Sequence, residues 1–207
     1  MREINPKDTS RAYAFEMWMQ APMPMVTFFK TLEVSRLVKI SRKKGFKFNM
    51  LMCYCIGRAA SRVKEFYMLP VGDKLMQFDH LAINTIVMSR TGNIVTCDIP
   101  FSADIHKFAE DYLRLTQQAA ATDEEFNLGD DYMVIGTSAL TKCELDSVVN
   151  LYAGFYNNPF VVWGKYRKGW FKTSLPISFQ FHHTQMDGPV STGFLNRLQE
   201  VFNSIDY

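Results

Sequence analysis

Two adjacent histidines, His182 and His183, precede Asp187 near the C-terminus. Imidazole is a common general base because its charge changes near neutral pH. The residues before the pair alternate between apolar and polar, which is typical of a strand, so the two imidazoles are expected on opposite faces. Because the two nitrogen ligands would diverge and no cysteine lies nearby, the pair does not predict a tetrahedral zinc site.

The hydrophobic period changes directly after this stretch. Beyond Asp187-Gly188-Pro189, apolar residues recur at helical spacing: Val190, Phe194, Leu195, Leu198, Val201 and Phe202. We therefore expect a buried strand, a turn that carries the histidines, and a final helix that begins near Asp187. A rigid strand end can hold a catalytic base, although histidine pairs also occur in strands for packing alone.

The larger pattern Gln-x-His-His-x-x-x-Asp-Gly resembles the active-site signature of the chloramphenicol acetyltransferase family. The resemblance extends over nearly the whole chain. It implies that His183 is the general base and that Asp187 has a structural role. Within the signature, Thr184, Pro189 and Val190 differ from the residues usual in the family, so the resemblance leaves the identity of the acceptor open.

A second family pattern, Arg-x-x-x-Phe-Glu-x-aromatic, is matched by Arg11, Phe15, Glu16 and Trp18. The resemblance implies an ion pair between Arg11 and Asp187. It also implies that Trp18, usually a tyrosine, contacts the acceptor. Taken without the family, Arg11 would be interpreted as a solvated charge on a first helical turn, where a cation is slightly unfavourable.

A third match lies in the middle of the chain, where Ser138-Ala139-Leu140 resembles a family segment whose serine donates a hydrogen bond to the oxyanion of the intermediate. The resemblance gives Ser138 that role, whereas a serine at a strand end would otherwise be expected to bond within a turn. Val162 stands where the family usually has a threonine near the reacting groups. This difference suggests a slower or retuned enzyme.

The resemblance further implies a homotrimer with active sites between subunits. Acetyl-CoA would be the co-substrate, no metal would be needed, and the acceptor would be a small molecule with a hydroxyl group, chloramphenicol first. Two alternatives remain open from the sequence. One is an acetyltransferase for a different small acceptor, and the other is a non-catalytic homologue that binds ligands on the same trimeric scaffold.

Composition narrows the class of protein. The chain of 207 residues is 47% hydrophobic, and we expect one domain over residues 1–207. The net charge of +2 argues against nucleic acid as a partner, and the lack of an apolar run of about 18 residues argues against a membrane partner. No signal peptide is expected. The four cysteines are interpreted as buried thiols in a reducing cytoplasm.

The order and type of the elements fit an α/β fold, a two-layer sandwich with a mixed β-sheet, which is the CoA-dependent acyltransferase fold that the resemblance implies. Helices are expected at 11–20, 35–44, 48–66 and 102–121, besides the C-terminal one. Strands are expected at 25–34, 75–78, 84–89, 94–99, 131–138, 147–152, 159–166 and 170–183. The run Arg42-Lys43-Lys44 is interpreted as a solvated helix end, with a phosphate contact as the alternative.

Overall fold

The strand that leads to the histidines, β10 (Thr173–His182), lies inside a mixed sheet. The computed structural model describes residues 1–206, and the order of its main sheet is β2-β10-β8-β7-β5-β6, with β9 paired to β10. Strand β10 is antiparallel to its neighbours β2 and β8, while β5, β7 and β8 are parallel to one another. The remaining strands of this sheet are β2 (Met25–Glu33), β5 (His80–Met88), β6 (Ile94–Pro100), β7 (Tyr132–Ala139), β8 (Phe160–Trp163) and β9 (Arg167–Lys168).

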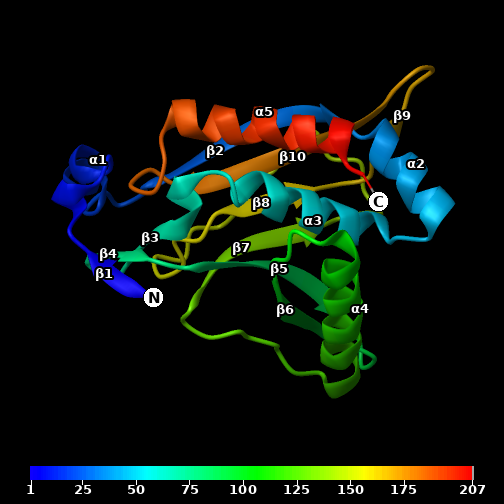
Figure 1. The fold of residues 1–207 in the computed structure, drawn as a ribbon, viewed down its shortest axis with the longest axis horizontal. Coiled ribbons are helices and arrows are strands. Elements are labelled where there is room, and N and C mark those ends of the chain that lie inside the picture. The colour runs from blue at the N-terminus through cyan, green and yellow to red at the C-terminus, as the bar shows by residue number, and fades with distance from the viewer. Residues whose placement is uncertain (207) are drawn as a thin grey trace.

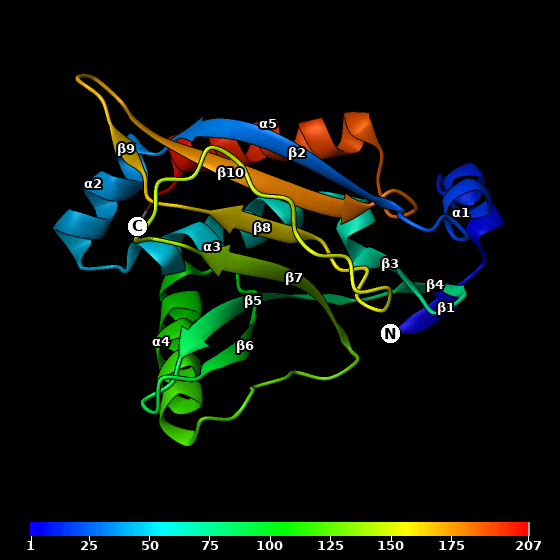
Figure 2. The same cartoon turned by 180° about the vertical axis from the view of Figure 1, so that it is seen from behind.

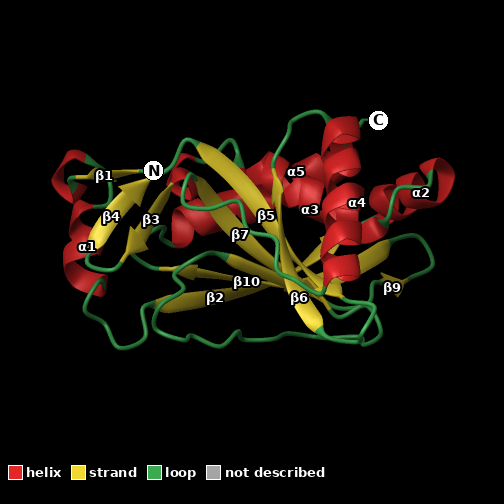
Figure 3. Ribbon diagram, turned by 90° about the horizontal axis from the view of Figure 1, so that it is seen from below, coloured by secondary structure: helices red, strands yellow, loops and turns green. Residues whose placement is uncertain are grey.

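Helices cover one face of this sheet, as Figures 1 and 2 show from opposite sides. They are α2 (Ser35–Lys44), α3 (Phe48–Ala60), α4 (Ile105–Thr122) and α5 (Gly188–Ser204). The chain also forms α1 (Ala12–Trp18) and 3-10 turns at Pro6–Asp8 and Lys64–Tyr67. A small sheet of β1 (Arg2–Ile4), β4 (Lys74–Gln77) and β3 (Met68–Val71) lies with α1 at one end of the molecule, opposite α2 and β9 (Figure 3). The two-layer α/β architecture with a mixed sheet is the one that the sequence predicts.

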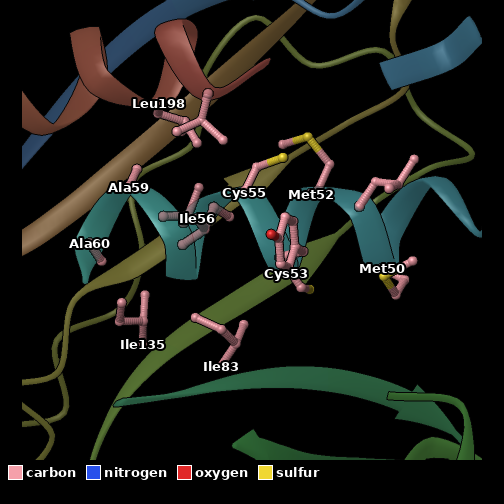
Figure 4. Close-up of a cluster of buried hydrophobic side chains, with 14 of the residues drawn as sticks. Met50, Met52, Cys53, Cys55, Ile56, Ala59, Ala60, Ile83, Ile135 and Leu198 are labelled. Atoms are coloured by element: carbon pink, nitrogen blue, oxygen red, sulfur yellow. The ribbon is translucent and has the colours of Figure 1, made fainter. Parts of the chain in front are cut away.

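The core lies between α3 and the sheet. Leu175, Ile177, Phe179 and Phe181 alternate along β10 and are at most 2% exposed, because a period of two sends them all to the helical face. On α3, residues on every side are buried, since strands lie below it and α5 lies above it. Figure 4 shows Ile56 and Ala59 of α3 between Leu198 of α5 and Ile83 and Ile135 of the strands.

The opposite face of the sheet is partly covered by an irregular segment, residues 140–159. The predicted strand at 147–152 is wrong, because these residues form no regular element. Instead, Val148 N donates to Ser178 Oγ at 3.0 Å, and Gln180 Nε2 donates to Asn150 O at 3.2 Å. Polar side chains of β10 thus satisfy backbone groups that a neighbouring strand would otherwise pair.

Other boundaries differ in ways that have local causes. The long helix predicted at 48–66 ends at Ala60, and a 3-10 turn then leads into β3, which the sequence analysis did not predict. Helix α2 agrees with its prediction and ends where Gly45 adopts the left-handed conformation at φ +75°.

Three cysteines are buried as expected, but Cys143 is exposed because it lies in the irregular segment. None of the helices within residues 1–206 is long and apolar enough to cross a membrane.

Candidate active site

His183 occupies the first position after β10, where the chain leaves the sheet. Its backbone N–H donates to Pro24 O at 2.8 Å, which ties it to the residue before β2. The chain then turns, with Gln185 N donating to His182 O at 2.9 Å. One of these backbone hydrogen bonds is made by His183 itself and the other closes the turn around it. Together they fix the direction in which the imidazole leaves the strand.

Asp187 ends this turn and begins α5. Its Oδ1 accepts from Val190 N at 3.3 Å, which is the N-cap bond that a carboxylate makes at a helix start. Pro189 occupies the first helical turn, where a residue without a backbone N–H is tolerated. Although burial acts to raise the pKa of Asp187, hydrogen bonds from Arg11 and from Val190 N hold that pKa below its ordinary value. The carboxylate is thus a fixed anion of the helix cap.

Arg11 is only 3% exposed and binds the turn with its whole guanidinium group. Its Nη1 donates to Asp187 Oδ2 at 2.9 Å, so the ion pair expected from the sequence is present. Its Nε and Nη2 donate to the carbonyl oxygens of Thr184 and His183, at 2.9 and 3.0 Å. These two backbone acceptors carry no sequence signal, so the sequence analysis missed them. Arg11 therefore holds the backbone of the histidine as well as the aspartate.

Trp18, the last residue of α1, stacks on the His183 ring. The ring centroids are 4.7 Å apart and the planes differ by 17°. His183 is half-buried, and its Nδ1 is buried without a hydrogen-bond partner within residues 1–206. The indole thus restricts rotation of the imidazole. The stacking of Trp18 on His183 was not expected from the sequence, and the contact of Trp18 with the acceptor stays a prediction.

His182 points to the opposite face and is 2% exposed. Its Nδ1 accepts a hydrogen bond from Thr184 N at 3.1 Å, so it is a structural part of the turn. Burial, together with the neighbouring His183, lowers the pKa of His182 from 6.5 to about 4. This ring is therefore neutral at neutral pH and has a packing role.

We expect His182 to make the fold sensitive to acid. Between pH 6.5 and about 4 the unfolded chain protonates this imidazole while the folded chain does not, so the free energy of unfolding falls as the pH falls. The loss is on the order of 3 kcal/mol across this window. Denaturant unfolding of His182→Asn, whose amide oxygen can accept the same bond, should lack this part of the pH dependence. Parallel curves for variant and wild type would contradict the assignment.

Ser138 lies near the end of β7, on the face away from the helices. Its neighbour Thr137 contacts Cys53 of α3, and alternation sends the serine to the other side. The register places Ser138 beside Val162, and Val162 beside Ser178 of β10. Val162 is only 3% exposed, so this row of three neighbouring side chains across β7, β8 and β10 is partly covered. Ser138 is half-buried at the carboxyl ends of the parallel strands.

The same register separates Ser138 from His183 within one chain. His183 is five residues beyond Ser178, which is about 17 Å along the strand, and two strand spacings add about 10 Å sideways. An oxyanion donor and a general base must both reach one reacting centre, each within about 3 Å. The two residues therefore cannot serve one site in a single copy of this chain.

A cavity of about 670 Å³ opens at the end of the sheet that carries Ser138. Thr141, just beyond β7, and Gly164, just beyond β8, form part of its wall. Lys47 and Lys165 supply two exposed cations. This cavity could not be predicted from the sequence, because its walls come from segments that are distant in the chain and meet only at the ends of the parallel strands.

Aromatic rings complete this wall. Phe48 and Tyr166 both line the cavity, with ring centroids 5.2 Å apart. Apolar rings beside cations suit a ligand that joins a flat heterocycle to phosphate groups.

Comparisons with known proteins agree with this architecture. Chloramphenicol acetyltransferase 3 of Escherichia coli is 29% identical over 179 residues, which span 84% of this chain and 83% of that protein. A chloramphenicol acetyltransferase of Clostridium perfringens is 29% identical over 168 residues, spanning 79% of this chain and 81% of that protein. Among solved structures, a chloramphenicol acetyltransferase superposes with a TM-score of 0.83 at 20% identity, covering 96% of this chain and 98% of its own.

A more distant structure shares the fold alone. A probable dihydrolipoamide acetyltransferase from Listeria monocytogenes superposes with a TM-score of 0.71 at 11% identity, covering 98% of this chain and 94% of its own. The fold is thus that of the CoA-dependent acyltransferases, and the protein is an acyltransferase. The family model described as chloramphenicol acetyltransferase matches residues 2–199, so the chain belongs to the chloramphenicol acetyltransferase family.

Proposed function

We propose that the protein transfers an acetyl group from acetyl-CoA to a hydroxyl group of a small acceptor, with chloramphenicol as the first candidate. The observation that carries the proposal is the pairing of a positioned imidazole at one end of the sheet with a serine at the other end, where a cavity with two cations opens. A homotrimer arranged head to tail would bring the His183 end of one copy to the Ser138 end of the next. The reaction site then lies between subunits.

In this mechanism His183 is the general base. It removes the proton of the acceptor hydroxyl as the acceptor oxygen bonds to the thioester carbonyl carbon. Ser138 Oγ–H donates to the oxyanion that forms. When the intermediate collapses, the carbon–sulfur bond breaks and the CoA sulfur leaves with the proton that His183 returns. Arg11 and Asp187 touch no reacting atom and act by holding the turn.

We assign acetyl-CoA to the cavity at the Ser138 end. The phosphate groups of CoA are complementary to Lys47 and Lys165, and its adenine is complementary to the rings of Phe48 and Tyr166. The position of the cavity at the ends of parallel strands lets the thioester extend toward Ser138. We place the protein in the cytoplasm, where acetyl-CoA is made and where the thiols of Cys53, Cys55 and Cys97 stay reduced.

A different acceptor is the second candidate, and Trp18 and Val162 favour it. An indole in place of a phenol and a valine in place of a threonine change the shape and the hydrogen bonds offered to an acceptor. Release of free thiol from acetyl-CoA, with chloramphenicol and with a panel of small alcohols and amines, tests both candidates. CoA binding without thiol release for any acceptor would instead indicate a non-catalytic homologue.

The shared site predicts that two inactive variants restore one another. Ser138→Ala alone should lower kcat about 10²–10³-fold, the usual effect of losing one oxyanion donor. When Ser138→Ala and His183→Ala chains assemble together at random, about a quarter of the sites combine an intact serine with an intact histidine. Mixed oligomers should therefore recover about that share of wild-type activity. The control is a mixture of the two variants assembled separately, which should stay inactive. Inactive mixed oligomers would contradict the shared site, because they would show that both residues act from one chain or that neither acts.

A further inference from the structure

The net charge of +2 conceals an uneven distribution of charge. Of the 23 Lys and Arg residues, ten lie in the segments 35–47 and 165–172, which contain no Asp or Glu. The other 13, together with all 21 acidic residues, give the rest of the chain a net charge of −8. We call these two segments together the basic end of the molecule.

The two segments are neighbours in space. Thr173 N donates to Ser35 Oγ, and Val34 N donates to Thr173 O, both at 2.8 Å, so the base of the β9–β10 hairpin is fixed to the start of α2. Figures 1 and 2 show the hairpin projecting beside α2 from opposite views. Acidic residues neutralise part of this charge, because Arg36 pairs with Asp206 and Arg167 pairs with Asp146.

Several basic side chains nevertheless face solvent. Lys39, Arg42 and Lys43 of α2 are exposed, as are Lys168 and Lys172 of the hairpin. The alternative considered for the run at 42–44, a phosphate contact, therefore gains support from residues far away in the sequence.

The tip of the hairpin is aromatic and fully solvated. Gly169 N donates to Lys172 O at 2.8 Å, which leaves Trp170 and Phe171 alone at the turn, 99% and 95% exposed. Tight turns favour glycine, asparagine and aspartate, and large rings are strongly disfavoured in water. Neither local propensity nor packing within residues 1–206 accounts for these two residues, which indicates that they contact another molecule.

We propose that the hairpin tip and the basic end dock on the surface of an anionic lipid bilayer. Trp170 and Phe171 would enter the interfacial layer, where aromatic rings are favoured, while Lys168 and Lys172 meet the headgroup phosphates. The order of these groups favours lipid over nucleic acid, because the rings lie outermost and the cations behind them. The proposed docking differs from the expectation of no membrane partner. That expectation rested on the lack of an apolar run, which excludes a membrane-spanning helix and not docking on a membrane surface. The proposal does not depend on the acyl transfer reaction.

Flotation of the full chain with vesicles tests this docking. The protein should partition onto phosphatidylcholine vesicles that contain phosphatidylglycerol, and not onto pure phosphatidylcholine. Trp170→Ser with Phe171→Ser should weaken this partitioning at least about tenfold. Phe155→Ser with Tyr156→Ser is the matched control, because these rings are 70% exposed and residues 147–159 around them contain no Lys or Arg. That pair should leave partitioning unchanged.

The charge contribution is tested separately. Lys168→Gln with Lys172→Gln should weaken partitioning about 25-fold, from roughly fivefold per cation near an anionic surface. Lys7→Gln with Lys64→Gln removes the same charge from exposed positions outside the basic end and should have little effect. Equal reductions from both pairs would mean that only net charge matters, and the proposed docking face would be wrong.

Three further results would overturn the proposal. One is equal binding of the protein to neutral and anionic vesicles. Another is a lower molar mass of the Trp170→Ser, Phe171→Ser variant in light scattering, because the tip would then be a contact between copies of the chain. The third is retention of a single-stranded oligonucleotide through the tip without vesicle binding. An unchanged molar mass together with lost partitioning is the result that the proposal requires.

Discussion

Replacing His183 with alanine should lower kcat for acetyl transfer by about 10²–10⁴-fold, the range that a positioned general base contributes. The reason is that the His183 imidazole is the proton acceptor that the stacked Trp18 ring and the anchored turn hold in place. The KM for acetyl-CoA should change little, because the proposed CoA cavity lies at the other end of the sheet. Thiol release at saturating substrate measures the effect.

His80→Ala is the matched control, since that histidine is exposed at the start of β5 and lies outside the site. It should keep wild-type kcat. Thermal unfolding of both variants separates lost chemistry from lost folding. Full activity in His183→Ala would remove the base assignment and with it the proposed mechanism.

Arg11→Leu should lower the free energy of unfolding by about 2–4 kcal/mol, because buried backbone acceptors lose their donor while Asp187, whose side chain is 41% exposed, can be solvated. Arg11 is 3% exposed and serves three acceptors, of which two are the backbone oxygens of His183 and Thr184. Leucine would leave these oxygens without the Arg11 donor, and the Asp187 carboxylate would keep only the hydrogen bond from Val190 N. Urea unfolding measures the loss, and kcat should fall as well because the histidine backbone is released.

Two conservative variants separate charge from geometry. Arg11→Lys keeps the charge, but one ammonium group cannot replace a planar fork that reaches three acceptors, so most of the loss should remain. Asp187→Asn keeps an oxygen that can accept from Val190 N, so it should lose less than Arg11→Leu. A loss below about 1 kcal/mol for Arg11→Leu would place Arg11 among surface ion pairs and contradict its structural role.

The sequence by itself determined the elements whose periodicity is strong. The strand and helix on either side of Asp187 follow from a change of hydrophobic period, and β10 and α5 occupy those places. The basic helix at 35–44 and the strands at 84–89 and 94–99, which pair as β5 and β6, are predicted by equally local signals. The contact between Arg11 and Asp187 was predicted from two motifs of the family and not from a physical argument. No local property of an arginine reveals a partner 176 positions away.

The tertiary structure alone decided how these elements are placed relative to one another. Segment 147–152 has the composition of a strand, but the polar side chains of Ser178 and Gln180 bond its backbone and hold it across the sheet. The separation of Ser138 from His183 depends on strand order and direction, which alternation within a strand does not encode. Likewise the basic end exists only because α2 and the hairpin meet. Such features arise from contacts between distant segments, and a pattern of neighbouring residues carries no record of them.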